Sequence, residues 1–132
     1  WSSDVCSSDL DILNIIFPEC KVQQNYRGFD WLKRKTNSME IDIFIYNKDK
    51  TFTLAVEYDG PQHFKPVRFG GRDLQDAIAA LKETKKRDRI KSKLIKAHTN
   101  DIKYFIRFNY KNKPTKELVI KKLIKNQVIN KP

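Results

Sequence analysis

The stretch MEIDIFIY (residues 39–46) and the stretch FTLAVEYD (residues 52–59) decide the fold of this chain. Both segments are rich in β-branched and aromatic residues, which favour strands. The turn-like segment NKDK (residues 47–50) lies between them. Two such segments joined by a short polar connection are typical of a β-hairpin, so we predict a hairpin centred on residues 49 and 50.

The apolar residues of the two segments set the register of this predicted hairpin. On one face, a symmetric hairpin pairs Ile41 with Tyr58, Ile43 with Val56, and Ile45 with Leu54. On the other face, the same register places Asp42 opposite Glu57 and Glu40 opposite Asp59. Because side chains alternate across a strand, a slip of one residue would break both the apolar and the acidic match.

The carboxylates that gather at one end of the hairpin predict a metal site. Like charges side by side on a sheet cost stability unless a positive charge lies between them. A hard divalent cation, which takes oxygen ligands, commonly supplies that charge. Asp42, Glu57 and Asp59 are the candidate ligands, and His63 follows them in the turn GPQH. The alternative interpretation is an exposed acidic sheet face, with His63 an ordinary surface residue.

The charge of the chain points to a polyanionic partner. The chain has 132 residues, enough for one domain, and a formal net charge of +11. From residue 82 onward the only acids are Glu83, Asp88, Asp101 and Glu117. An acidic island on a basic protein suits a nucleic acid that is held by lysines and arginines while a metal acts on it. A small phosphate ester would need no such extended positive surface.

Cysteine content and hydropathy exclude several classes of protein. Cys6 and Cys20 form neither a metal-ligand spacing nor a disulfide framework. No apolar run has the length of a membrane span, and no segment has the pattern of a signal peptide. We therefore expect a cytoplasmic protein without membrane association; its oligomeric state is left open.

The first ten residues, WSSDVCSSDL, are expected to be foreign to the domain. They contain Ser-Ser-Asp twice, and the segment VCSSDL is what a common sequencing adapter gives when it is translated. We therefore expect a single domain over residues 11–132 that is truncated at its N-terminus.

The rest of the chain predicts helices around the hairpin. Residues 11–17 have the apolar pattern of a helix that ends before Pro18. The other expected elements are a strand at 21–26, a loop at 61–72, a long helix from Asp73 to about His98, a strand at 102–110 and a helix at 114–127. This order predicts an α/β domain with a central mixed sheet flanked by helices.

Two charged residues interrupt the apolar side of the predicted long helix. Asp88 and Lys91 share that side with Ala77, Leu81 and Ile95. Burying a charge is costly unless the charge is paired. One interpretation is that both residues reach the acidic end of the sheet, where Lys91 meets phosphate. The other is an ion pair between Asp88 and Lys91. The opposite, lysine-rich side of the helix reads either as a solvated face or as a DNA-binding track.

These motifs together resemble the PD-(D/E)XK nuclease superfamily, in particular the branch of very-short-patch mismatch endonucleases and phage homing endonucleases. The matching elements occur in order. They are Asp42 on the first hairpin strand, EYDGPQH at 57–63, Gly70-Gly71 in the loop, RDRIK at 87–91 on the long helix, and IRF at 106–108. The resemblance covers roughly residues 11–127.

The resemblance implies a bacterial or phage-encoded DNA endonuclease of the homing or mismatch-nicking type, with a restriction-endonuclease-like fold. It implies Mg²⁺ or Mn²⁺ as cofactor and DNA as partner. The implied catalytic residues are Asp42, Glu57, Asp59 and His63, the first three being metal ligands. The implied DNA-binding residues are Lys86, Arg87, Lys91 and Arg107. His63 would activate water or protonate the leaving group.

The chain departs from the family pattern at two positions. The usual lysine, two residues after the second acid, is replaced by Asp59. A glutamate that this branch carries on its first helix is also missing, and Glu19 lies beyond Pro18. The alternative function is a non-catalytic nucleic-acid-binding module on the same fold. A further alternative is a phosphatase that acts on small phosphate esters.

Overall fold

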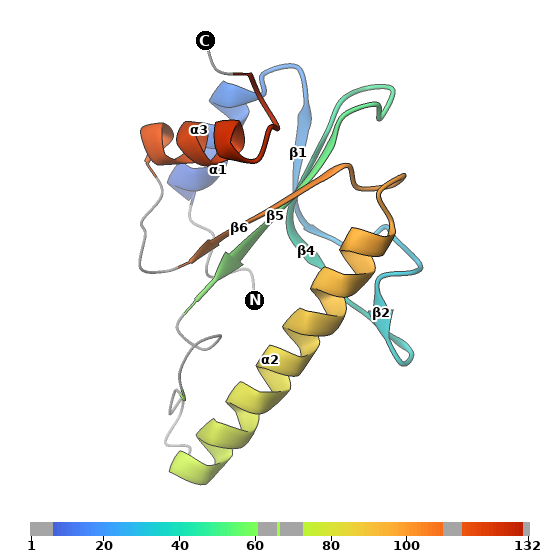
Figure 1. The fold of residues 1–132 in the computed structure, drawn as a ribbon, viewed down its shortest axis with the longest axis vertical. Helices are drawn as coiled ribbons and strands as arrows, with labels where there is room; N and C mark the ends of the chain where they lie inside the picture. Colours follow the sequence, from blue (N-terminus) through green and yellow to red (C-terminus); the bar gives the residue numbers. More distant parts are fainter. Residues whose placement is uncertain (1–6, 61–65, 67–72, 110–114, 131–132) are drawn as a thin grey trace.

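The protein folds around a four-stranded mixed β-sheet with helices on both faces (Figure 1). The computed structural model describes residues 7–60, 66, 73–109 and 115–130. The elements are α1 (Ser7–Ile16), β1 (Lys21–Tyr26), β2 (Lys33–Arg34), β3 (Asn37–Ser38), β4 (Ile41–Tyr46), β5 (Thr53–Asp59), α2 (Leu74–Ala97), β6 (Tyr104–Asn109) and α3 (Lys116–Lys125).

The sheet has the strand order β1-β4-β5-β6. β1, β4 and β5 run antiparallel, whereas β6 lies parallel to β5. A parallel neighbour requires a crossover connection, and α2 supplies it here. The predicted hairpin register is confirmed for Ile43 with Val56 and Ile45 with Leu54. The ladder ends at Ile43, so the predicted pairs of Ile41 with Tyr58, Asp42 with Glu57 and Glu40 with Asp59 are not part of it.

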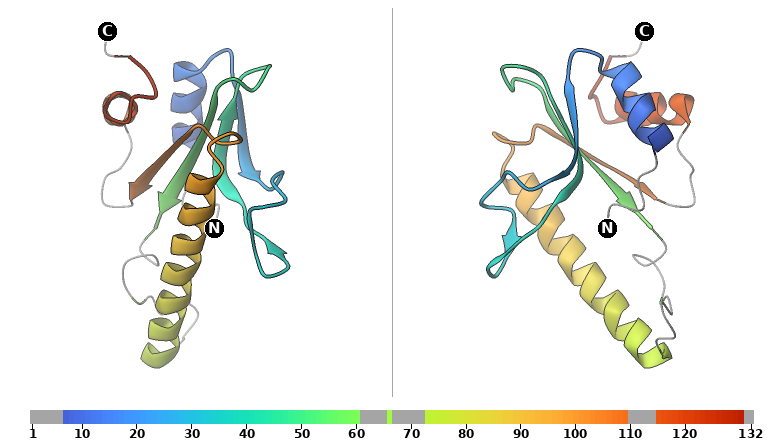
Figure 2. Two further views of the ribbon diagram at one scale, coloured as in Figure 1. Left: turned by 45° about the vertical axis from the view of Figure 1, so that its right-hand side comes forward. Right: turned by 180° about the vertical axis from the view of Figure 1, so that it is seen from behind.

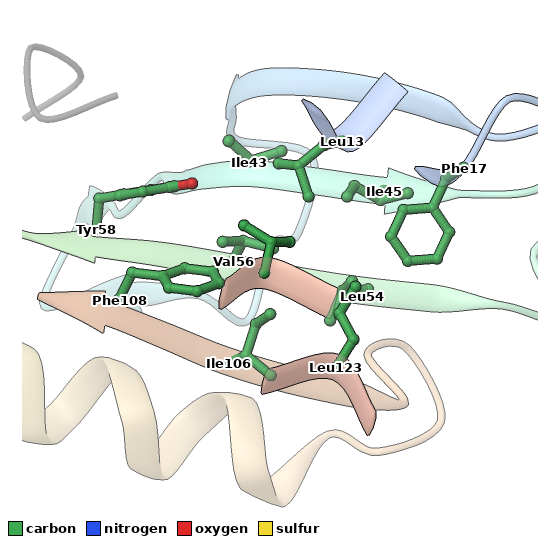
Figure 3. Close-up of a cluster of buried hydrophobic side chains, with 11 residues drawn as sticks. Leu13, Phe17, Ile43, Ile45, Leu54, Val56, Tyr58, Ile106, Phe108 and Leu123 are labelled. Carbon is green, nitrogen blue, oxygen red and sulfur yellow. The ribbon is translucent and has the colours of Figure 1, made fainter. Parts of the chain in front are cut away.

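One face of the sheet is covered by α1 and α3 (Figures 1 and 2). Ile43, Val56 and Ile106 project from this face into an apolar core (Figure 3). Leu13 from α1 and Leu123 from α3 close the core, and neither has exposed surface. Alternation along β4 and β5 thus directs Ile43 and Val56 to this face and places Asp42 and Glu57 on the other.

The other face of the sheet carries α2 (Figure 2). Asp73 caps this helix at its N-terminus, where its side chain accepts a hydrogen bond from the Asp76 N–H (2.8 Å). Ile95 anchors the C-terminal half against Phe44 and Ala55 of the sheet. The N-terminal half extends past the end of the sheet (Figure 1). The C-terminal half of α2 therefore fixes which helix residues reach the ends of β4 and β5.

Most of the predicted elements are confirmed, with three differences. The short hairpin of β2 and β3 was not predicted, and Ile41 packs in the core cluster on the α2 face although the hairpin prediction put it with Ile43. α1 begins at Ser7, inside the segment that we expected to be foreign; the origin of that segment stays a prediction. Among the described residues, no helix combines the length and apolar character needed to cross a bilayer.

Candidate active site

The acidic residues of the hairpin lie at one end of the sheet, on the face that carries α2. Asp42 and Glu57 belong to adjacent strands and project to the side opposite Ile43 and Val56. Both acids are almost fully buried, with 4% and 3% of their surface exposed. The sheet end and α2 together enclose them in a cavity of about 140 Å³.

This cavity collects most of the site residues that the sequence predicts. Its lining includes three predicted carboxylates and three predicted basic residues: Asp42, Glu57, Asp59, Arg87, Lys91 and Arg107. Two predicted residues are not among them. Lys86 is exposed and does not line the cavity. His63 lies outside the described residues, as do Gly70 and Gly71.

Asp42 is held by the neighbouring strand. Its Oδ2 accepts a hydrogen bond from the backbone N–H of Tyr58 (2.8 Å). The bond follows directly after the last ladder pair, Ile43 with Val56, so the carboxylate takes the place of a backbone acceptor at the strand end. Asp42 is therefore positioned before any ligand binds.

Glu57 forms an ion pair with Lys91, which reaches down from α2. The pKa of Glu57 is raised to about 8: burial is the main cause, Lys91 opposes the shift, and the nearby charge of Asp42 adds to it. The effect of Asp42 shows that the two carboxylates are close enough to interact. Of the two interpretations of Lys91, the one in which it reaches the acidic end of the sheet is confirmed; its contact with phosphate stays a prediction.

Asp59 has a different partner from the other two acids. Arg107 Nη1 donates a hydrogen bond to Asp59 Oδ1 (2.6 Å), and Arg107 Nη2 donates to Ser92 Oγ on α2 (2.7 Å). The parallel pairing of β5 and β6 brings Arg107 alongside Glu57 in the ladder. Lys122 of α3 donates to the Arg107 carbonyl oxygen. Arg107 therefore ties the site to both helix layers.

Arg27 and Ser38 also line the cavity, and the sequence did not point to either of them. Arg27, just after β1, forms an ion pair with Glu40 (Nε to Oε2, 3.4 Å), and its Nη1 donates to the Ser38 carbonyl oxygen (3.2 Å). Ser38 belongs to the short β2–β3 hairpin. Strands of two residues have no periodicity to detect, so only the position of Arg27 at the end of a predicted strand could have suggested it.

The predicted metal site with the ligands Asp42, Glu57 and Asp59 is matched only in part by the positions of these acids. Among the described residues, no three His, Cys, Asp or Glu side chains are grouped so that they could hold a metal ion. Asp42 and Glu57 are nevertheless buried together, and the Glu57 Oε1 lies against the ammonium group of Lys91, so a divalent ion would take the position of a positive charge that is already there. A pair of buried carboxylate oxygens is a donor set that suits Mg²⁺ or Mn²⁺. We therefore treat Asp42 and Glu57 as the residues that fit a divalent ion.

Comparison with known proteins does not assign the chain to a family. No protein-family model, curated protein or solved structure matches it. Its function therefore has to be argued from the cavity itself.

Proposed function

We propose that the protein is a divalent-metal-dependent endonuclease that hydrolyses phosphodiester bonds in DNA. One observation carries the proposal: two buried carboxylates, Asp42 and Glu57, meet a helix-borne Lys91 in a cavity at the end of the sheet. Buried carboxylates are costly unless they are paired or bind a metal, and such clusters with perturbed pKa values are enriched in functional sites. The surrounding motifs resemble those of PD-(D/E)XK nucleases, and we propose that the mixed sheet with its flanking helices is a restriction-endonuclease-like fold. Both support the same reaction.

Each residue of the cavity has a defined task in this proposal. Asp42 and Glu57 would hold Mg²⁺ or Mn²⁺, which when bound lowers the pKa of a water molecule and offsets the charge at phosphorus. Lys91 keeps Glu57 in place, and its ammonium group can donate hydrogen bonds to a phosphate oxygen. Arg87 and Arg107, which line the same cavity, position the DNA backbone.

The proton transfers of the reaction need a further group. His63 is our proposal for it, because an imidazole is the side chain best suited to exchange protons near neutral pH. Asp59, which Arg107 holds near the cavity, would act as an additional ligand, directly or through water.

The test is incubation of supercoiled plasmid with Mg²⁺ or Mn²⁺. We expect nicked or linear product from the wild-type chain and none in EDTA. Asp42→Ala and Glu57→Ala should each lower the cleavage rate on the order of a hundredfold or more. Each change removes a ligand of the divalent ion, and with it the positive charge held at the reacting phosphate. His63→Ala should also lower the rate.

A DNA-binding measurement on the same variants separates a loss of catalysis from a loss of binding. Removing a negative charge from the cavity should leave the affinity for plasmid DNA unchanged or slightly higher. Asp49→Ala, at the far end of the same hairpin, is the matched control and should cut like the wild type. If Asp42→Ala and Glu57→Ala both lose DNA binding, the two acids do not act as a metal site.

A second candidate function is favoured by one observation. The ion pair with Lys91 already compensates the charge of Glu57, as a purely structural pair would. The protein would then be a nucleic-acid-binding module without catalysis. Its signature is binding that weakens with salt, by about 0.9 log units per contacted phosphate for each log unit of salt, with no metal-dependent strand breaks.

A further inference from the structure

A second hollow lies directly beside the active-site cavity. It has a volume of about 510 Å³ and is formed by one flank of α2 together with the end of β5 and β6. Asp59, Asp88 and Arg107 line both hollows, so the two are contiguous. We call the second hollow the basic groove; its other lining residues are Arg89, Ser92, Lys93 and Lys96 of α2.

The basic groove differs from the cavity in its charge. The cavity lining has more acids than bases, whereas the groove has four bases and two acids. Arg107 is already bound to Asp59. Arg89, Lys93 and Lys96 are exposed, and none has an ion pair with another described residue. These three positive charges are therefore available to an anion from solution.

The spacing of the three bases also favours an anionic ligand. Arg89 and Lys93 are four residues apart on α2, and Lys96 follows three residues later, so they line one flank of the helix. Like charges at these spacings destabilise a helix slightly, and an anion between them removes that cost. From Arg89 to Lys96 the helix advances about 10 Å, at 1.5 Å per residue. One DNA strand advances roughly 3.4 Å per phosphate along its axis, so the flank can face more than one phosphate.

Ser92 gives the groove a neutral hydrogen-bonding group. Its Oγ accepts a hydrogen bond from Arg107 Nη2 (2.7 Å), which leaves its own O–H able to donate. Hydroxyl groups of this kind, together with lysine and arginine, are the usual donors to the phosphates of DNA.

We propose that the basic groove binds DNA backbone phosphates next to the phosphate held in the active-site cavity, so that the substrate must be a polynucleotide. The inference rests on the proposed endonuclease function and adds to it a backbone-binding site on Arg89, Lys93 and Lys96. Contacts of this type position the strand and carry no sequence information.

The test measures binding of a fluorescently labelled DNA duplex in EDTA over a series of salt concentrations. Lys93→Gln/Lys96→Gln removes two groove charges. Lys116→Gln/Lys121→Gln removes two exposed charges from α3, on the opposite face of the sheet, and is the matched control. Two lost phosphate contacts should reduce the slope of log affinity against log salt by about 1.8 in the groove variant. The control should keep the wild-type slope.

Cleavage assays separate this inference from the proposed function. With Mg²⁺, the groove variant should cut plasmid more slowly than the wild type, whereas Lys116→Gln/Lys121→Gln should cut it at the wild-type rate. If the wild-type chain cuts plasmid but the groove variant keeps the wild-type slope, the inference about the groove is wrong and the endonuclease function is supported. A slope that falls in the groove variant alone, with no cleavage by any chain, would support DNA binding by the basic groove and contradict the proposed endonuclease function. Equal falls in both variants would show diffuse charge attraction and overturn the groove.

Discussion

The two ends of the β4–β5 hairpin treat their acids in opposite ways. At the turn, Asp49 is exposed and accepts hydrogen bonds from the N–H and the hydroxyl of Thr51, which hold the pKa of Asp49 below its usual value. At the open end, Glu57 is buried, and burial raises its pKa to about 8. At the turn, the carboxylate of Asp49 is hydrogen-bonded by Thr51, two residues away. At the open end, the carboxylate of Glu57 depends on Lys91 from a helix that is distant in sequence. The difference marks the open end as the place where the fold holds charge at a cost.

Removing Lys91 should give the largest effect, because it leaves Glu57 buried without a counter-charge. We expect Lys91→Met to lower the free energy of unfolding by roughly 3–5 kcal/mol, the cost of removing one partner of a buried ion pair, and to raise the pKa of Glu57 above about 8. Urea denaturation measures the change. Lys85→Met, an exposed position on the same helix, should stay within about 0.5 kcal/mol of the wild type. Equal, small effects of both changes would mean that the open end is no costlier than the surface.

Glu57 should also give the protein a distinct pH dependence. Its pKa is raised on folding from 4.5 to about 8, so the folded state binds more protons between these values. The contribution of Glu57 to stability is therefore full below about pH 4.5 and is lost as pH rises to about 8, at roughly 1.4 kcal/mol per pH unit. Glu57→Gln should remove this slope from the unfolding curves. A slope that persists in the variant would have to come from another group.

The smallest effect is expected at the turn, with the opposite sign. The pKa of Asp49 is lowered on folding, so its contribution is present above the usual carboxyl pKa and is lost as pH falls. Asp49→Asn should therefore lower stability only slightly at pH values above the usual carboxyl pKa, and the difference from the wild type should disappear toward acid pH. The same unfolding series measures it. A change in the slope of stability against pH between about 4.5 and 8, where Glu57 titrates, would show that the two ends of the hairpin are coupled.

The sequence predicts the hairpin well because its signals are local. The alternation of Ile43 and Ile45 with Asp42 and Phe44 fixes both the strands and the face of each side chain. Asp73 likewise marks the start of α2 through a cap that involves only its own first turn. Apolar periodicity and capping require no knowledge of the rest of the fold.

The partners across the site could not be predicted in the same way. Lys91 stands out in the sequence as a charge on an apolar helix side, but its pairing with Glu57 rather than Asp88 depends on how α2 crosses the sheet. The bond from Arg107 to Asp59 depends on the parallel pairing of β6. The raised pKa of Glu57 depends on burial, which is a property of the packed fold.

The central claim is that the carboxylates of Asp42 and Glu57 together form a site for a divalent ion. Calorimetric titration with Mn²⁺ at about pH 9, in the absence of DNA, tests it without any need for cleavage. We predict one saturable site in the wild-type chain and in Asp49→Asn, and no such site in Asp42→Asn or Glu57→Gln. Binding that survives in Asp42→Asn and Glu57→Gln, or a wild-type chain that binds no Mn²⁺, would contradict the account.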